Sequence, residues 1–220
     1  MDYQSIKSVF RENTNTERGE AMSAYLRNQF PCLGISSPLR KEISKEFLKE
    51  KVKSKSVDWE FIHWCFEQEE REFQYLATDY LRKVNPFLLE CDTEKLELLI
   101  LTKSWWDTVD ALNNNVGFIC LKYPHLKEDK IANWIEQENF WLKRISIIFQ
   151  LTYRRKTDSD FLARAILYNA NSKEFFVNKA IGWALRQYAR THPEWVAAFL
   201  EENVLHPLSV REARKYLPTP

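Results

Sequence analysis

Glycine is scarce in this chain, with 4 residues among 220. Rossmann sheets, phosphate-binding P-loops and turn-rich β folds depend on glycine for positive φ angles or for close approach of the backbone. The low glycine content therefore argues against all three classes. Segments that alternate apolar and polar residues, as half-buried β-strands do, are absent from the sequence as well.

Cysteine is also sparse, and its spacing favours no metal site. Cys32, Cys65, Cys91 and Cys120 form no C-x-x-C pair and have no histidine at ligand spacing. We therefore expect no zinc or other metal and no cofactor. A signal peptide and an apolar run of membrane length are also lacking, so we expect a cytoplasmic protein with no membrane partner.

An excess of charge of one sign is missing too, because 32 basic residues face 31 acidic ones and the formal net charge is +1. Binding to nucleic acid would thus require basic residues gathered on one face. The 4 histidines are scattered, which gives no support to acyl-transfer chemistry. Aromatic residues, in contrast, are abundant, with 8 Trp, 9 Tyr and 14 Phe.

Apolar residues recur at helical spacing through most of the chain. This spacing predicts helices over Glu70–Val84, Phe140–Tyr153 and Phe175–Ala189. Short breaks that contain proline separate the expected helices, at Ser37-Pro38, Asn85-Pro86, Tyr123-Pro124, His192-Pro193 and His206-Pro207. The pattern predicts an all-α fold.

The predicted helices follow a period. Arg71, Trp106, Trp141 and Phe176 are each 35 residues apart, and each lies near the start of an apolar helical stripe. A period in the mid-thirties with two helices per unit is typical of α-solenoids, nearest the HEAT and armadillo classes. We therefore expect one domain over residues 1–220, built as a curved solenoid with a concave binding face.

The stretch from Thr102 to Asp110 contains two adjacent tryptophans followed by two acids. We expect Ser104 to cap a helix on which Trp106 and Asp110, four residues apart, share one face. An aromatic ring and a carboxylate on one face attract positive charge. The alternative is that Trp106 belongs to the core and Asp110 is solvated.

The 35-residue register bears on this choice. Asp110 aligns with Tyr75, Ile145 and Ala180, so an acid stands at a position that is otherwise apolar. Such a local inconsistency is expected at functional sites. In another repeat, Gly182 precedes Trp183 within a predicted helix, and it predicts either close helix packing or close approach of a ligand.

Basic residues recur on the helices equivalent to the Trp106 helix. Arg144 and Arg186 lie on these helices, with Lys143 and Lys179 nearby. Individually each is explained as a solvated or helix-terminal charge. Together, a basic lining on consecutive repeats would form a groove for a phosphate backbone.

Several blocks of the chain resemble the AlkD-type DNA alkylation repair glycosylases. These blocks are Leu101-Thr-Lys-Ser-Trp-Trp-Asp-Thr-Val-Asp110, Trp141-Leu-Lys-Arg-Ile145, Lys179-Ala-Ile-Gly-Trp183 and Pro207-Leu-Ser-Val-Arg-Glu-Ala213. The resemblance covers almost the whole chain. It implies a HEAT-like solenoid that grips duplex DNA on its concave face and hydrolyses the N-glycosidic bond of cationic alkylpurines, such as 3-methyladenine and 7-methylguanine, without a base-flipping pocket.

The resemblance also assigns roles to residues. Carried over, the catalytic cleft consists of Trp106, Asp110 and Trp183, with Tyr25 as a further member. Among the basic residues named above, the two arginines match positions that contact the DNA backbone. The expected partner is double-stranded DNA with alkylated purines, bound by a monomer. Two alternatives stay open: a paralogue that binds DNA without excising bases, and a helical-repeat scaffold for protein partners.

Overall fold

The computed structural model describes residues 2–217 and groups the chain into two compact units, which meet in sequence between Leu89 and Glu90. Every regular element among these residues is a helix, and none is a strand. The prediction of an all-α fold is therefore confirmed. The single domain, the curvature and the concave face concern the chain as a whole and stay predictions.

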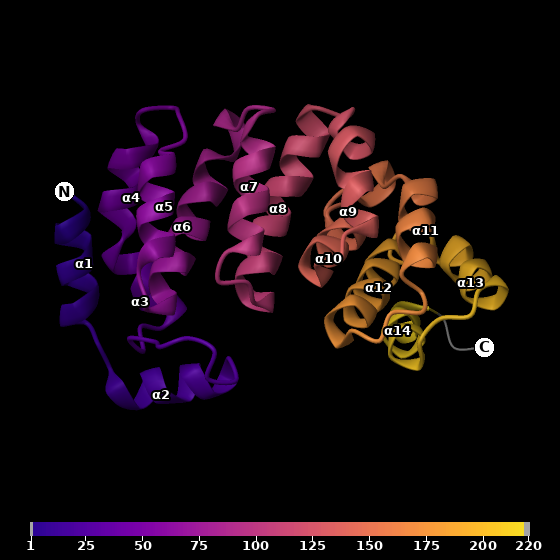
Figure 1. Cartoon of the computed structure of the whole chain (residues 1–220), viewed down its shortest axis with the longest axis horizontal. Coiled ribbons are helices and arrows are strands. Elements are labelled where there is room, and N and C mark those ends of the chain that lie inside the picture. Colours follow the sequence, from indigo (N-terminus) through magenta and orange to yellow (C-terminus); the bar gives the residue numbers. More distant parts are fainter. Residues whose placement is uncertain (1, 218–220) are drawn as a thin grey trace. The chain divides into compact units, whose positions relative to one another are not determined.

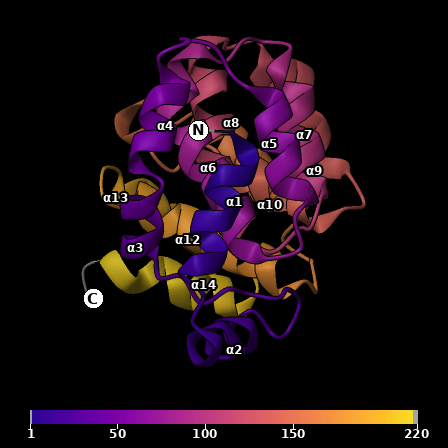
Figure 2. The same ribbon diagram turned by 90° about the vertical axis from the view of Figure 1, so that its left-hand side faces the viewer.

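The first unit contains six α-helices and one 3-10 turn (Figure 1). In both views α2 lies at one edge of this unit and runs across the direction of α1, α4 and α5 (Figures 1 and 2). The bounds are α1 Tyr3–Glu12, α2 Thr16–Tyr25, α3 Ser37–Ile43, α4 Lys45–Val52, α5 Trp59–Glu67, α6 Arg71–Val84 and the 3-10 turn η1 Asn85–Phe87.

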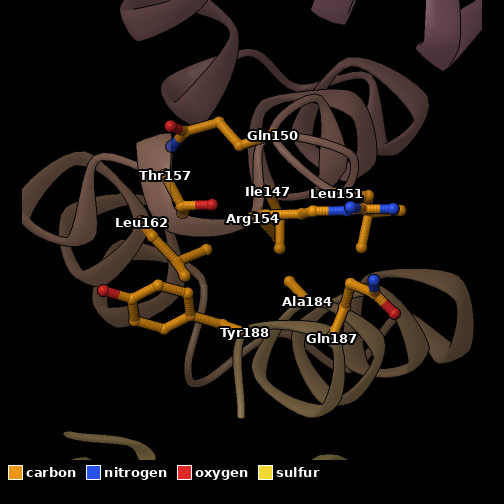
Figure 3. Close-up of a pocket in the computed structure, with 9 residues that line it drawn as sticks. All are labelled: Ile147, Gln150, Leu151, Arg154, Thr157, Leu162, Ala184, Gln187 and Tyr188. Carbon is orange, nitrogen blue, oxygen red and sulfur yellow. The ribbon is translucent and has the colours of Figure 1, made fainter. Parts of the chain in front are cut away.

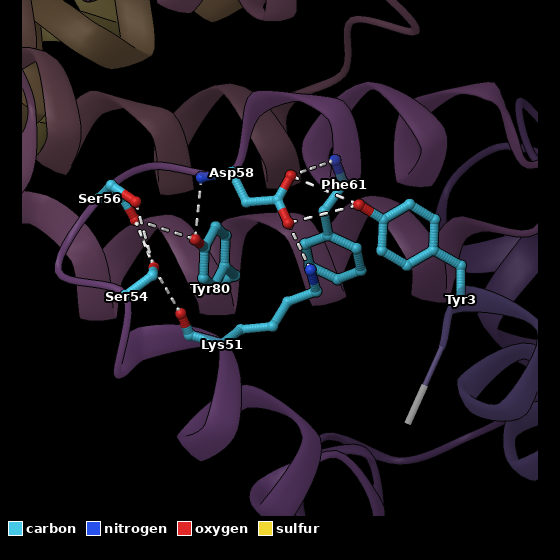
Figure 4. Close-up of polar contacts among 7 residues, drawn as sticks. All are labelled: Tyr3, Lys51, Ser54, Ser56, Asp58, Phe61 and Tyr80. Atoms are coloured by element: carbon cyan, nitrogen blue, oxygen red, sulfur yellow. Dashed lines mark hydrogen bonds and ion pairs between the residues drawn. The ribbon is translucent and has the colours of Figure 1, made fainter.

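A network of polar contacts holds α1 against α4 and α5 (Figure 4). Asp58 caps α5 by accepting from the Phe61 backbone nitrogen at 2.9 Å, and it also pairs with the Lys51 ammonium group. The Tyr3 hydroxyl donates to the same carboxylate at 3.3 Å. Burial and the neighbouring Asp58 raise the pKa of Tyr3 to about 12, so this hydroxyl stays protonated as a donor.

The segment that follows α2 is fixed by a buried carboxylate on α6. Glu72 is fully buried, and it accepts from the backbone nitrogens of Leu33, Gly34 and Ile35 at 2.8 to 3.1 Å. Gly34 has a φ of +83°, a conformation that side chains rarely adopt. A charged acceptor with three donors is well satisfied in the interior, so this segment has a defined path.

The described part of the second unit, Glu90 to Leu217, contains eight α-helices. The helices α8, α10, α12 and α14 form one row in which each packs against the next, while α7 and α9 pack on α8 and α10 respectively. The bounds are α7 Asp92–Leu101, α8 Trp106–Lys122, α9 Ala132–Glu136, α10 Phe140–Ile148, α11 Ser159–Tyr168, α12 Phe175–Tyr188, α13 Pro193–Glu202 and α14 Pro207–Ala213, with a π-helical turn Lys127–Ile131 and 3-10 turns Arg154–Lys156 and Arg214–Tyr216.

The predicted period is confirmed by where the helices begin. The helices α6, α8, α10 and α12 start at Arg71, Trp106, Phe140 and Phe175, which are 34 or 35 residues apart. One predicted end was wrong, because α10 stops at Ile148 and not at Tyr153. The chain turns after Ile148, yet Phe149 and Tyr153 remain buried, so the apolar pattern runs past the end of the helix.

Candidate functional site

The helix α8 begins without the serine cap that the sequence predicts. Trp105 occupies the N-cap position, and no side chain caps the helix there. The Ser104 hydroxyl instead donates backwards to the carbonyl of Ile100, at 2.6 Å on the last turn of α7. The cap prediction was wrong because α8 begins one residue later than a cap at Ser104 requires. As a result, Trp106 is the first residue of α8.

The two neighbouring tryptophans have different surroundings. Trp105 packs edge-on against Trp141 and Phe176, with ring centroids 6.0 and 5.3 Å apart, and its Nε1 is buried without a hydrogen-bond partner. Trp106 is half-buried and lies one turn before Asp110 on α8. Trp105 therefore belongs to an aromatic cluster that joins α8, α10 and α12, and Trp106 is the one that shares a helix face with Asp110.

Asp110 makes a two-point ion pair with Arg144 of the next helix in the row, α10. Arg144 Nε donates to Asp110 Oδ1 at 2.7 Å, and Nη2 donates to Oδ2 at 2.8 Å. The Arg144 side chain is 5% exposed, whereas that of Asp110 is 20% exposed. Forked geometry of this kind fixes both groups in orientation as well as in distance.

Arg144 also reaches α12. Its Nη1 donates to the carbonyl oxygen of Phe176 at 2.6 Å, and its guanidinium carbon lies 5.8 Å from the centre of the Trp183 ring. Three of the predicted site residues, Asp110, Arg144 and Trp183, thus form one connected group across α8, α10 and α12. A contact between Arg144 and DNA stays a prediction, and the structure gives this arginine a second role as the partner of Asp110.

The predicted basic residues of α12 converge on an acid that the sequence analysis did not single out. Glu212 on α14 is buried, and its carboxylate lies 3.1 Å from Lys179 Nζ, 2.5 Å from Arg186 Nη1 and 2.7 Å from Lys215 Nζ. The hydrogen bond from Lys215 and then that from Lys179 lower the pKa of Glu212 to about 2, against the opposing effect of burial.

Gly182 allows α14 to lie this close to α12. A Cβ at Gly182 would stand 2.5 Å from the Glu212 Cβ and 2.9 Å from the Ser209 carbonyl oxygen. Ser209 also donates its hydroxyl to the Asn178 carbonyl at 2.9 Å, which ties the two helices together. Of the two readings of Gly182 offered by the sequence, close helix packing is the one observed.

Two predicted site residues lie outside these groups. Tyr25 is the last residue of α2, in the first unit, and is 72% exposed. Lys143 is half-buried on α10, next to Arg144 in sequence. Their participation in a site stays a prediction.

A small cavity lies between the end of α10, α11 and α12 (Figure 3). Arg154 and Gln187 border it on one side, and Thr157 and Tyr188 border it on the other. Its volume is about 10 Å³, which is room for about one water molecule and not for a purine. A larger surface hollow of about 490 Å³, bordered by Glu97, Lys130 and Trp134, shares no residue with the predicted site.

The described residues include neither a metal-binding cluster nor a membrane-spanning helix. Within residues 2–217, no group of three or more His, Cys, Asp or Glu side chains is placed to hold a metal ion. Over the same range, no helix combines the length and the apolar character needed to cross a membrane.

The fold and the site define an all-α protein in which an acid–arginine–tryptophan group joins consecutive helices of a row. A sequence model of the DNA alkylation repair enzyme family matches residues 6–217. Among solved structures, a predicted DNA alkylation repair enzyme from Enterococcus faecalis is 35% identical with a TM-score of 0.88, and the match covers 94% of this chain and 98% of that chain. No curated protein matches the chain.

The chain therefore belongs to the DNA alkylation repair enzyme family. This membership confirms the resemblance seen in the sequence and assigns the chain a role in the repair of alkylated DNA.

Proposed function

We propose that this protein is a DNA glycosylase that hydrolyses the N-glycosidic bond of cationic alkylpurines, such as 3-methyladenine and 7-methylguanine, in duplex DNA. The observation that carries the proposal is the connected group of Asp110, Arg144 and Trp183, with Trp106 one turn from the carboxylate. It combines aromatic faces with an oriented acid, which is what a developing sugar cation requires.

The substrate class follows from the chemistry available. A purine alkylated at N3 or N7 carries a positive charge and is already a good leaving group, so it needs no general acid. As the bond breaks, the positive charge moves to the deoxyribose, which becomes oxocarbenium-like. The enzyme then has to stabilise that cation and supply a water molecule to its anomeric carbon.

The ion pair with Arg144 restricts what Asp110 does in this reaction. Both carboxylate oxygens accept from Arg144, so the pair as a whole is close to neutral and its long-range field is weak. Each oxygen keeps a further lone pair, and 20% of the Asp110 side chain is exposed. We therefore assign Asp110 to orienting the attacking water and to stabilising the sugar cation at close range, with Arg144 as its positioning residue.

The half-buried indoles of Trp106 and Trp183 supply the remaining stabilisation. A ring face beside a cation contributes roughly 0.5 to 2 kcal/mol, depending on how far water is excluded. Neither ring loses or gains a proton, so their contribution should be independent of pH. Tyr25 is proposed as a further aromatic member, and Lys143, Lys179 and Arg186 as contacts of the DNA backbone.

Release of 7-methylguanine from methylated duplex DNA tests the proposal directly. The wild type should release the base, and Asp110→Asn should reduce release about 100- to 1000-fold, the range for removing one preorganised electrostatic group. Glu202→Gln, at an exposed position on α13, changes the net charge equally and should leave release unchanged. Absence of release from the wild type would remove the glycosylase assignment and leave the two alternatives, a paralogue that binds DNA without excising bases and a helical-repeat scaffold for protein partners.

A further inference from the structure

Three cations of the second unit share one buried carboxylate. Lys179 and Arg186 lie two turns apart on α12, Lys215 follows α14, and all three lie within 3.1 Å of Glu212. Their side chains are 38%, 23% and 51% exposed, whereas that of Glu212 is 7% exposed. The acid is thus covered, and the cations face outward around it.

The charges of this cluster do not cancel. Three positive groups surround one negative group, so the cluster carries an excess of two positive charges at an exposed surface. If Glu212 served only to neutralise, one cation would be sufficient. An outward-facing excess with a buried anchor is instead the arrangement of an anion site whose cations are held in place.

The position of Glu212 depends on the close approach of α14 to α12. Gly182 lies between Lys179 and Arg186 on α12, and its missing side chain leaves space for the Glu212 Cβ. From this position the carboxylate reaches the cation one turn before Gly182 and the cation one turn after it. Trp183 is the next residue along the helix, so the cluster adjoins the candidate catalytic group.

We propose that Glu212 is a positioning residue that holds Lys179, Arg186 and Lys215 as one binding site for a phosphate of the DNA backbone. The proposal rests on the proposed function, because it takes duplex DNA as the ligand. In this arrangement, the phosphate lies across the exposed amino and guanidinium groups while Glu212 stays beneath them. The site would set the register of the backbone next to Trp183.

Positioning and neutralisation predict opposite signs for the loss of Glu212. If the acid only neutralises, Glu212→Gln adds one net positive charge and should tighten binding to duplex DNA. If the acid positions the cations, Glu212→Gln should weaken binding in spite of the added charge. Glu212→Asp separates the two further, because it keeps the charge and shortens the reach.

The experiment measures the Kd for a short unmodified duplex as a function of salt concentration. Each phosphate contact adds about 0.9 to the slope of log K against log salt concentration, so at 0.1 M salt the loss of one contact should lower the affinity about tenfold. Both Glu212→Gln and Glu212→Asp should therefore weaken binding about tenfold and reduce the slope by about 1. The matched controls are Glu202→Gln and Glu202→Asp on α13, where the side chain is exposed.

The thermal midpoint of each variant is measured beside its affinity, so that binding is compared only below unfolding. The proposal is supported if Glu212→Asp binds the duplex more weakly with a reduced salt slope while Glu202→Asp binds as the wild type does. Unchanged binding by Glu212→Asp, or tighter binding by Glu212→Gln, overturns the positioning role of Glu212. The glycosylase assignment still stands in that case if the wild type releases the base. A wild type that binds no duplex overturns both.

Discussion

Removing either partner of the Asp110–Arg144 pair should cost stability, and removing both should cost less than the sum. The pair is held by two charge-assisted hydrogen bonds of 2.7 and 2.8 Å, and the arginine side chain is 5% exposed. Breaking a buried pair from one side costs about 3 to 5 kcal/mol, because the remaining charge stays desolvated.

The two single variants should differ in size. Asp110→Asn leaves a buried guanidinium whose acceptors are one amide oxygen and the Phe176 carbonyl, so we expect a loss near the lower end, about 3 kcal/mol. Arg144→Met leaves an acid that is 20% exposed and can be hydrated, although the Phe176 carbonyl loses its donor. We expect a loss of about 2 kcal/mol for this variant.

The double variant Asp110→Asn with Arg144→Met should lose about 3 kcal/mol and not about 5 kcal/mol, which gives a coupling of about 2 kcal/mol. Urea unfolding followed by tryptophan fluorescence measures all four proteins. Losses that add within about 0.5 kcal/mol would refute the coupling.

Base release by the same proteins, measured where all are folded, tests the positioning role separately from stability. We expect Arg144→Met to reduce release while Asp110 is still present, because the carboxylate then lacks a fixed orientation. Full release by Arg144→Met would refute that role, whatever its stability.

Two further predictions concern the contact between α12 and α14. Gly182→Ala should destabilise the protein by about 2 kcal/mol or more, because the new Cβ would stand 2.5 Å from the Glu212 Cβ and 2.9 Å from the Ser209 carbonyl oxygen. Thermal unfolding measures this loss, and an unchanged midpoint would contradict the close contact. Because the pKa of Glu212 is lowered from 4.5 to about 2, its contribution to stability is present above about pH 4.5 and is lost as the pH falls towards about 2. Glu212→Gln should therefore lose less stability than the wild type over that interval in urea titrations, and parallel losses would contradict this.

The sequence predicted helix starts well, because they depend on local signals. Apolar spacing gave the starts of α10 and α12, and the proline breaks predicted at His192-Pro193 and His206-Pro207 coincide with the starts of α13 and α14. Helix ends and caps were harder. Ser104 has the right residue type for a cap, yet Trp105 occupies the N-cap position, and the Ser104 hydroxyl donates to the Ile100 carbonyl.

The sequence singled out the candidate site residues but not the partners that hold them. The register identified Asp110 as an acid in an apolar row, and the structure shows why it is tolerated there: Arg144, almost one repeat later, supplies the counter-charge. The spacing of 34 residues between them was a usable signal, since equivalent positions of adjacent repeats lie side by side. Glu212 had no such signal, because its contacts depend on the distance between α12 and α14.

Trp183 adjoins two centres of related design. In the Asp110 centre, Arg144 contacts the Trp183 ring and holds Asp110. In the Glu212 centre, Lys179 and Arg186, which flank Trp183 along α12, are held by Glu212. In the first centre a buried cation orients an acid, and in the second a buried acid orients cations. A ligand that carries a sugar cation beside a backbone phosphate would present complementary charges to both centres at once. Substitutions in the Glu212 centre should therefore change the affinity for undamaged duplex, whereas substitutions in the Asp110 centre should change the rate of base release at saturating DNA.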